Sequence, residues 1–447
     1  MKVLHVPFCY YPDPVGGTEV YVEGLTRFQR ESGVETAVAA PDKENSAYTH
    51  GGSPVYRFRI ATELTLRQVY GEGDPEAAQE FCKILDRVRP DVVHLHGFTS
   101  GVSIRLVRSA RGLGLPVAYT YHTPSVTCVR GTLLRWGSGV CDGEMDVQKC
   151  AACMLQGKGV PKAASRLLGA LPPGIGARLG AWGLVGSGWT ALRATELVEV
   201  HNSAARELFA EVDSVVAVCE WARDVLIRNG VDARKIILCR QGLGGQVRNS
   251  GGERPRSTNG LLRIAFLGRL DATKGVEILI DALQLAPELR ASVDIFAVTQ
   301  GAKAQALRDA LLAKSARDKR ICFKDPIPAE SIVDRLREYD VLAVPSQWME
   351  TGPLVVYESF AAGTPVLGSN LGGIAELVRH DVNGLLVEAS SREAWAKALR
   401  RLVEEPALLP KLRLGIGPVR TMQHVAGEMQ SVYERLVRPD KQAQAVC

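Results

Sequence analysis

The chain has 447 residues, of which 46% are hydrophobic and 23% are charged. This length exceeds one ordinary hydrophobic core and suits two domains of about 200 residues each. The composition excludes a disordered or fibrous protein, since disorder requires less apolar content and more net charge. The net charge of +5 is small beside 54 basic and 49 acidic residues, so we expect no nucleic-acid partner.

We expect no export signal and no transmembrane segment. The first eight residues are too short an apolar stretch for a signal peptide, and Pro12 and Asp13 follow soon after. The most apolar long stretch, 167–189, contains two consecutive prolines and several glycines, which prevents one spanning helix. We therefore expect a cytoplasmic protein whose ten cysteines are reduced.

Short apolar strands alternate with helical patterns along the whole chain. In the first half the pattern predicts strands at 2–6, 92–95, 117–121, 214–218 and 236–239, with helices at 18–29, 80–87, 102–111 and 221–229. In the second half it predicts strands at 263–267, 293–297, 341–344 and 365–368, with helices at 275–283, 303–312, 393–402, 428–436 and one beginning at Gly352. Such alternation is typical of parallel sheets covered on both faces. We expect an α/β fold of two Rossmann-like domains that face a central cleft.

Composition suggests where these domains begin and end. The first domain spans 1–242, with a Cys-bearing and helical insertion at about 123–209 where the alternation breaks. Residues 243–260 are rich in Gly, Ser, Asn and Arg, which indicates a linker. The second domain spans 261–420, and we expect the helix and tail at 421–447 to cross back to the first domain.

Two cations flank the start of a helix in the second domain. Residues 268–275 follow a strand and open a helix, with Thr273 placed to cap it. Arg269 and Lys274 lie at the positive end of that helix, where a diphosphate would gain donors from both side chains and from first-turn amides. The alternative is a strand-to-helix turn with two solvated cations. Ligands of open parallel sheets bind beyond the carboxyl ends of strands, which favours such loops as the site.

Two carboxylates, separated by seven residues, flank the start of another helix. Pro353 suits the first helical position, which leaves the amides of Leu354 and Val355 pointing outward. Glu350 precedes this helix and Glu358 lies inside it. Carboxylates accept from pairs of hydroxyls, so Glu358 could hold a ribose and Glu350 a sugar. The alternative is a surface helix with favourable acidic residues at its start.

Further motifs extend this pattern through the second domain. They are Pro345-Ser346, Glu350-Thr351-Gly352-Pro353-Leu354, Glu358, Ala361-Ala362-Gly363-Thr364-Pro365-Val366, Gly372-Gly373-Ile374-Ala375-Glu376-Leu377-Val378 and Asn383-Gly384-Leu385-Leu386-Val387. With the two cations, they make nearly all of 264–402 resemble the second domain of family 4 retaining glycosyltransferases of the GT-B fold. Many members of that family have an aromatic residue and Gly after the first Glu, whereas this chain has Thr351-Gly352-Pro353.

The resemblance implies an enzyme that moves a sugar from a nucleotide-diphosphate donor to a glycan or lipid-linked glycan acceptor, in polysaccharide or cell-envelope biosynthesis. It implies that Arg269 and Lys274 bind the donor diphosphate, that Glu358 binds the ribose hydroxyls and that Glu350 contacts the transferred sugar, with Gly352 in the same motif. We find no acidic-x-acidic pair closing an apolar strand, the metal-carrying device of GT-A enzymes. We therefore expect catalysis without a metal or other cofactor.

The first domain contributes further candidates. Gly16 and Gly17 lie between a strand and a helix, where a backbone without Cβ atoms lets a ligand approach, although a plain turn fits equally well. His122 ends a strand and resembles the family's His beside the donor sugar, where it would orient a hydroxyl or stabilise charge; a structural His is the alternative. His94 and His96 face one side of a strand, but no third metal ligand is evident, so a structural or acceptor-side role is expected.

The segment 158–193 combines basic and apolar residues and contains no acidic residue. Its members are Lys158, Lys162, Arg166, Arg178 and Arg193, interleaved with Leu167, Leu168, Leu171, Leu179 and Trp182. Such helical pieces can rest on an anionic membrane, which would suit a lipid-linked acceptor. A helical cap that packs its apolar side inward is the alternative.

Four cysteines, Cys128, Cys141, Cys150 and Cys153, lie in one loop region. Cys150 and Cys153 have the spacing of half a zinc knuckle, and four thiolates would complete a closed tetrahedral site. We expect a structural zinc, with an iron–sulfur cluster or four unrelated thiols as alternatives.

Two other functions remain open from the sequence. One is a GT-B nucleotide-sugar epimerase, and the other is a catalytically silent subunit that binds a sugar nucleotide.

Overall fold

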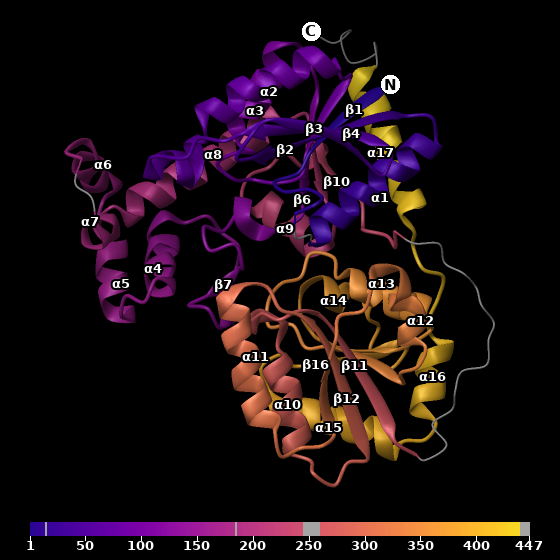
Figure 1. Cartoon of the computed structure of the whole chain (residues 1–447). Coiled ribbons are helices and arrows are strands. Elements are labelled where there is room, and N and C mark those ends of the chain that lie inside the picture. The colour runs from indigo at the N-terminus through magenta and orange to yellow at the C-terminus, as the bar shows by residue number, and fades with distance from the viewer. Residues whose placement is uncertain (14–15, 184–185, 245–259, 439–447) are drawn as a thin grey trace. The chain divides into compact units, whose positions relative to one another are not determined.

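The structure is a computed structural model that describes residues 1–13, 16–183, 186–244 and 260–438 (Figure 1). It divides into two compact units. The first comprises Met1–Gly244 and Met422–Cys447, and the second comprises Gly245–Thr421. Most of the predicted linker at 243–260 lies outside the described residues.

The first unit is built on a sheet with the strand order β10-β9-β6-β5-β1-β2-β4-β3. Its strands are β1 (Lys2–Val6), β2 (Glu35–Asp42), β3 (Ser46–His50), β4 (Ser53–Arg59), β5 (Val92–Leu95), β6 (Val117–Tyr121), β9 (Ser214–Ala217) and β10 (Ile236–Leu238). Every pair is parallel except the hairpin β3–β4. The order reverses between β1 and β5, which makes the carboxyl ends of these two strands a topological switch point.

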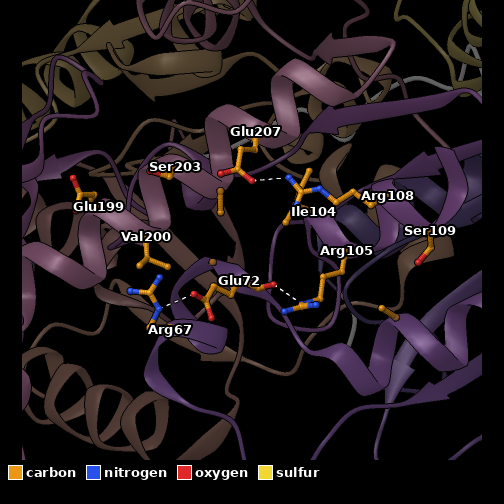
Figure 2. A pocket seen from close by; sticks show the side chains of 13 residues that line it. Arg67, Glu72, Ile104, Arg105, Arg108, Ser109, Glu199, Val200, Ser203 and Glu207 are labelled. Atoms are coloured by element: carbon orange, nitrogen blue, oxygen red, sulfur yellow. Dashed lines mark hydrogen bonds and ion pairs between the residues drawn. The ribbon is translucent and has the colours of Figure 1, made fainter. Parts of the chain in front are cut away.

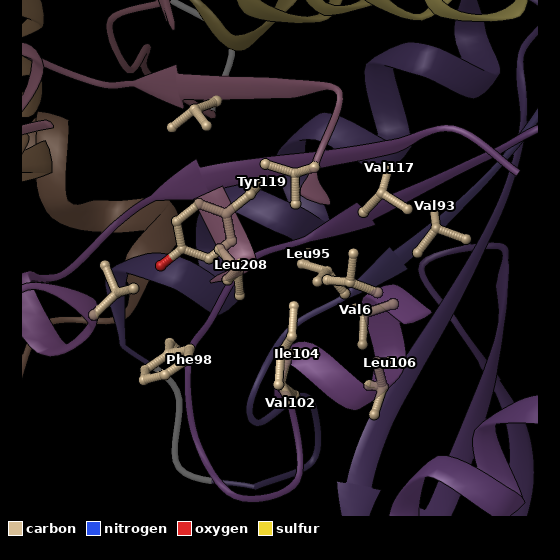
Figure 3. Close-up of a cluster of buried hydrophobic side chains, with 14 of the residues drawn as sticks. Val6, Val93, Leu95, Phe98, Val102, Ile104, Leu106, Val117, Tyr119 and Leu208 are labelled. Carbon is tan, nitrogen blue, oxygen red and sulfur yellow. The ribbon is translucent and has the colours of Figure 1, made fainter. Parts of the chain in front are cut away.

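Helices connect these strands and bury their apolar faces on the sheet. They are α1 (Gly17–Glu31), α2 (Pro75–Val88), α3 (Ile104–Gly112), α8 (Ala194–Glu211) and α9 (Glu220–Arg228), with a π-helical turn at Gln68–Glu72. Figure 3 shows Val6, Leu95 and Tyr119 of the strands against Leu106 and Leu208 of the helices, all fully or almost fully buried. Burial of each such side chain contributes about 1.5–3 kcal/mol.

The last helix, α17 (Met422–Val437), belongs to the first unit. The Met422 amide donates to the Leu243 carbonyl at 2.9 Å. The helix packs on α1, where a Cβ on Gly24 would lie 3.2 Å from the Met422 side chain. Met429 and Tyr433 are completely buried in the same contact layer.

The predicted insertion folds as short elements beside α8. They are a 3-10 turn (Pro124–Val126), the hairpin β7 (Leu134–Arg135) and β8 (Gly139–Val140), α4 (Val147–Gly157), α5 (Lys162–Gly169), α6 (Pro173–Ala181) and α7 (Ser187–Leu192). Ala151, Met154 and Leu155 of α4 pack on Ala194 and Val198 of α8. Within the described ranges, no helix combines the length and the apolar character needed to cross a bilayer.

The second unit has an all-parallel sheet with the order β13-β12-β11-β14-β15-β16. Its strands are β11 (Leu262–Arg269), β12 (Ala291–Val298), β13 (Ile321–Lys324), β14 (Val341–Val344), β15 (Val366–Ser369) and β16 (Gly384–Val387). The helices are α10 (Val276–Gln284), α11 (Gly301–Ser315), α12 (Ile332–Leu336), α13 (Leu354–Ala361), α14 (Gly372–Leu377), α15 (Arg392–Glu404) and α16 (Leu408–Leu414). The order reverses between β11 and β14, so the loops after these two strands flank the switch point of this unit.

Candidate active site

An ion pair joins the two loops that flank this switch point. Lys274, in the turn after β11, places its Nζ 2.6 Å from Oε1 of Glu350, which follows β14. Ser346 Oγ and Trp348 Nε1 donate to the same oxygen at 2.8 and 2.9 Å. The Lys274 ammonium also lies 5.7 Å from the centre of the Trp348 ring. The structure thus brings together two of the predicted site residues.

Electrostatics keep the Glu350 carboxyl ionised although it is buried. Burial acts to raise the pKa of Glu350, but the Lys274 charge and the hydrogen bonds from Lys274, Ser346 and Trp348 outweigh it, so the pKa falls below its ordinary value. The carboxylate in turn holds the Lys274 side chain, which is only partly exposed.

Close backbone approaches fix the loops that carry this pair. Gly275 has φ +71°, and a Cβ there would lie 1.9 Å from the Pro345 carbonyl oxygen, so no side chain fits. The Gln347 amide donates to the Thr273 carbonyl at 2.6 Å. The Gly373 amide donates to the Glu350 carbonyl, also at 2.6 Å, which ties the loop after β15 to the same site.

Two predicted helix starts are wrong in detail. Thr273 does not cap α10, because its amide and hydroxyl donate to Asp271 Oδ1 at 2.8 and 2.6 Å and the helix begins only after Gly275. The other helix, α13, begins at Leu354 rather than at Gly352. Pro353 immediately precedes it. Leu354 and Val355 lie in its first turn, where backbone amides have no acceptor within the helix.

Arg269 and Glu358 occupy different surroundings. Arg269 is exposed at the carboxyl end of β11. Glu358 is partly buried on α13, and burial raises the pKa of its carboxyl from 4.5 to about 7. Within the described part of the chain, no donor lies within hydrogen-bonding distance of this carboxylate. Glu358 is therefore a poorly solvated acceptor that a pair of hydroxyls could satisfy.

In the first unit, Gly16 and Gly17 stand at the start of α1. The Gly16 amide donates to Oε2 of Glu19 at 2.6 Å, which closes the first turn. Among the described residues, a Cβ on Gly17 would meet nothing within 4 Å. The preceding loop is anchored by buried Arg57, which pairs with Asp13.

His122 belongs to a row of buried imidazoles at the switch point of the first sheet. His5 Nδ1 lies 3.0 Å from His96 Nε2, and His96 Nδ1 lies 3.0 Å from His122 Nε2. His94 stands beside this row, with Tyr433 OH and Thr120 Oγ1 each 2.7 Å from one of its ring nitrogens. Burial lowers the pKa of His5 to about 4 and that of His122 to about 3. It also places the pKa values of His94 and His96 well below the ordinary value, so these rings are neutral at pH 7.

His5 supplies a third ring beside His94 and His96, which the sequence did not indicate. Ligand atoms of the three residues lie within 4.8 Å of one another, close enough in principle for a metal ion. Both nitrogens of His94 already face hydroxyl groups, and those of His5 and His96 face each other and further polar side chains. Every ring nitrogen of these three histidines therefore already faces a polar atom of the chain.

Three of the four predicted zinc ligands lie near one another, because Cys128 and Cys141 both help to raise the pKa of the Cys150 thiol. Cys153 Sγ accepts from the Trp136 amide at 3.3 Å, while Cys150 donates to the Glu144 carbonyl at 3.8 Å. Among the residues described, no group of three or more ligand atoms within 4.8 Å includes Cys128, Cys141, Cys150 or Cys153. Burial raises the pKa of the Cys150 thiol to about 12. The structural zinc stays a prediction.

A pocket of about 760 Å³ lies elsewhere in the first unit, between the π-helical turn, α3 and α8. Figure 2 shows its arginines facing acidic groups: Arg67 pairs with Glu72 and Arg108 pairs with Glu207. Arg105 donates to the Glu72 carbonyl at 2.7 Å. The pocket is therefore balanced in charge, and none of the predicted site residues lines it.

Two features not assigned from the sequence help to build the site. Ser346 and Trp348 hold the Glu350 carboxylate, and Gly372 with Gly373 packs on the Glu350 backbone. Pro345-Ser346 and Gly372-Gly373 belong to the motifs of the second domain, but those motifs did not indicate these roles.

The raised pKa of Glu358 predicts how stability depends on pH. As pH rises from 4.5 to 7, the unfolded state loses the Glu358 proton before the folded state does, so the ligand-free protein loses stability. Glu358→Gln removes this loss. The free energy of unfolding of the variant, minus that of the wild type, should therefore increase over that interval and level off above it. Denaturant unfolding at several pH values measures the difference, with exposed Glu404→Gln as the control. A difference that stays constant between pH 4.5 and 7 would contradict the burial argument.

Comparison with known proteins places this geometry in a family. The model for glycosyl transferases group 1 matches residues 254–415, and the model for the glycosyl transferase 4-like domain matches residues 16–242. D-inositol 3-phosphate glycosyltransferase of Rhodococcus opacus is 32% identical over 220 residues, which cover 46% of this chain and 49% of that protein. The chain spans about half the length of the first curated relatives it matches.

Solved structures show the same fold over nearly the whole chain. Sucrose-phosphate synthase from Thermosynechococcus elongatus superposes with a TM-score of 0.65 at 16% identity, covering 98% of this chain and 100% of that one. Anabaena HepE, solved with UDP and glucose, superposes with a TM-score of 0.61 at 15% identity, covering 97% of this chain and 99% of that one. With both family models matched, the chain belongs to the group 1 glycosyltransferases, the family 4 enzymes of the GT-B fold.

Proposed function

We propose that the chain is a retaining, metal-independent glycosyltransferase that moves a hexose or related sugar from a nucleotide-diphosphate donor. The acceptor is a glycan or a lipid-linked glycan of polysaccharide or cell-envelope biosynthesis. The observation that carries the proposal is the Lys274–Glu350 pair at the switch point between β11 and β14, with Arg269 at the end of β11. The complex of Anabaena HepE with UDP and glucose supports a nucleotide sugar as the donor.

The Lys274–Glu350 pair suits a nucleotide-sugar donor, because negative charge grows on the diphosphate of the donor as the sugar leaves. Lys274 supplies a point charge and Arg269 a fork of donors, which together can stabilise a diphosphate leaving group without a metal ion. Glu350 keeps the lysine in place before the donor binds. Glu358, whose carboxylate is poorly solvated, gains hydroxyl partners when a ribose occupies the site.

Retention of configuration follows most simply from attack on the same face of the sugar. Three donors converge on Oε1 of Glu350, which makes this carboxylate a weak nucleophile for a double displacement. The leaving diphosphate can instead accept the proton of the acceptor hydroxyl as the new bond forms. His122, neutral at pH 7, orients a hydroxyl of the transferred sugar rather than attacking it.

Lys274→Ala and Arg269→Ala should each slow sugar transfer by about a hundredfold or more, because each removes a cation from the developing diphosphate charge. Steady-state kinetics with a panel of nucleotide sugars measures the effect. Exposed Lys397→Ala, in the same unit, controls for the loss of one positive charge. Product analysis separates transfer from epimerisation, and near-normal kinetics in either site variant would refute the assignment.

Transfer should continue in the presence of excess chelator, since protein cations rather than a metal are proposed to stabilise the diphosphate. The rate with donor and acceptor is compared before and after EDTA treatment. Loss of activity that magnesium or manganese restores would overturn metal independence.

The basic insertion provides a surface for a membrane that carries the acceptor. Leu167 is 75% and Trp182 72% exposed, although both are large and apolar. Lys162, Arg166 and Arg178 are exposed in the same stretch. Figure 1 shows α5, α6 and α7 grouped beside α4, away from the sheet of the first unit. Exposed apolar anchors among cations fit the interface of an anionic bilayer.

One of the five predicted cations does not belong to this surface. Arg193 has a side chain that is only 11% exposed, and its Nε lies 2.8 Å from Glu196 Oε2. It therefore pairs with a residue of the first turn of α8 and offers no charge to lipid.

The protein should bind anionic vesicles more tightly than neutral ones, and more tightly at low salt. Replacing both Leu167 and Trp182 by Ser should weaken binding about tenfold or more, because it removes the apolar anchors. Flotation with vesicles measures binding, and Leu113→Ser, which changes another exposed leucine of the first unit, is the control. Equal binding to neutral vesicles would contradict the membrane surface.

A further inference from the structure

The four cysteines of the insertion lie on a small framework of one hairpin and one helix. Strands β7 and β8 form the hairpin, with Cys128 before it and Cys141 directly after it. Cys150 and Cys153 lie three residues apart on α4, so their side chains share one side of the helix. The Cys141 amide donates to the Leu133 carbonyl at 2.9 Å, which closes the hairpin where its two ends meet.

The two thiols of the helix face the hairpin and the loop that follows it. Cys153 Sγ accepts from the amide of Trp136, in the turn between the two strands, at 3.3 Å. Cys150 donates to the carbonyl of Glu144, in the loop from the hairpin to α4, at 3.8 Å. The helix therefore presents both sulfurs to the segment that carries the other two cysteines.

Three of the thiols share one poorly solvated place. Burial raises the pKa of Cys150 to about 12, and the nearby thiols of Cys128 and Cys141 contribute to the rise. Cys128 also contributes to the raised pKa of Cys141, after burial and Asp142. A Zn²⁺ ion reverses this mutual opposition, because it deprotonates the thiols that coordinate it and attracts each thiolate.

Two cations lie beside these thiols. Arg130 Nη1 lies 3.5 Å from Cys153 Sγ and 3.1 Å from the Cys153 carbonyl oxygen. Burial acts to lower the pKa of Lys149, but Asp142 and the nearby thiols outweigh it, so this side chain stays charged. Zn²⁺ bound by four thiolates is a dianion, and these two cations can compensate its charge.

The hairpin has a strained backbone for so short an element. Its two strands have two residues each. Leu133 and Trp136 adopt positive φ values of 51° and 58°, which are unfavourable for residues with large side chains. Such a conformation persists only where its surroundings hold it. An ion that joins both ends of the hairpin to a helix is a constraint of this kind.

We propose that Cys128, Cys141, Cys150 and Cys153 bind one structural zinc ion that fastens the hairpin to the start of α4. Thiolate sulfur selects zinc over magnesium or calcium, and four protein ligands leave no open catalytic position.

Binding draws the sulfur atoms together. Sulfurs of a tetrahedral thiolate site lie about 3.8 Å apart. Among the described residues, no three ligand atoms that include these thiols lie within 4.8 Å of one another. Rotation of the cysteine side chains closes the site, since the hairpin and the helix that carry them already contact each other.

The zinc site adjoins the switch point of the first sheet. The Cys128 amide donates to the Pro124 carbonyl at 2.8 Å, in the 3-10 turn that follows His122. The Tyr121 hydroxyl and Thr127 Oγ1 lie 2.6 Å apart, which holds the same turn against β6. The ion therefore anchors the far end of the loop that leaves β6.

Metal analysis of protein produced without an affinity tag tests the assignment. The wild type should contain about one zinc per chain. Cys150→Ser combined with Cys153→Ser should lower the zinc content about tenfold or more. Cys82→Ser combined with Cys322→Ser, which changes two partly exposed thiols outside the insertion, should keep the zinc. A zinc-free wild type, or zinc retained by the first variant, would overturn the site.

Cobalt in place of zinc identifies the ligands even if the double variant at Cys150 and Cys153 does not fold. Co²⁺ held by four thiolates is tetrahedral and has intense visible bands, together with sulfur-to-cobalt bands in the near ultraviolet. The cobalt-loaded wild type should show both sets of bands. Weak visible bands typical of octahedral cobalt, or iron and acid-labile sulfide in the purified protein, would refute the zinc site.

Zinc should also protect the insertion from proteolysis. Arg130, Arg135 and Lys149 are cleavage sites for trypsin within this region, and cleavage requires the backbone to open locally. The double variant at Cys150 and Cys153 should be cut there about tenfold faster than the wild type and the control variant. Equal rates would show that no ion fastens the hairpin to the helix. These measurements require no sugar transfer, so they test the zinc site independently of the proposed function.

Discussion

A buried carboxylate remains ionised only where opposite charge and donors replace the water that it has lost, and the site of the second unit depends on that condition at Glu350. Lys274, Ser346 and Trp348 converge on one oxygen of the carboxylate, from two loops that follow adjacent strands. Removing Lys274 would leave the buried Glu350 carboxylate without its opposite charge. Removing Glu350 would leave the Lys274 side chain without the ion pair that positions it. The turn at Gly275 and the contact of Gly373 with Glu350 position this pair.

Much of the fold could be predicted from the sequence because parallel strands buried on both faces are continuous apolar runs. The strands at Val92–Leu95, Val117–Tyr121 and Val341–Val344 are found where they were expected. The strand β2 and the hairpin β3–β4 were missed; β3 is an edge strand whose residues are mostly exposed, whereas β2 and most of β4 are buried and their apolar runs were overlooked. Helix starts were displaced where a turn intervened, as at Asp271, whose side chain organises a 3-10 turn before α10 begins.

The site residues likewise fall into two groups, those indicated by local sequence motifs and those that only long-range contacts of the fold place. Lys274 and Glu350 stood in recognisable local motifs, and adjacency of β11 and β14 brings them together. Ser346 and Trp348 carry no signal for their role, because a hydroxyl or an indole near a glutamate is common. His5 could not have been placed beside His94 without the register of β1 on β5, which pairs these two residues directly. The spacing of the four cysteines gave a partial signal, since Cys128 and Cys141 lie close enough to Cys150 to raise the pKa of its thiol, although among the described residues no three ligand atoms that include these thiols lie within 4.8 Å of one another.

The two switch points solve the problem of buried polarity in opposite ways. In the second unit the full charge of Glu350 is kept and compensated by a lysine. In the first unit burial keeps the imidazoles neutral, and their polarity is satisfied by hydrogen bonds along the row. Burial thus leaves one switch point with an ion pair and the other with a neutral hydrogen-bonded cluster.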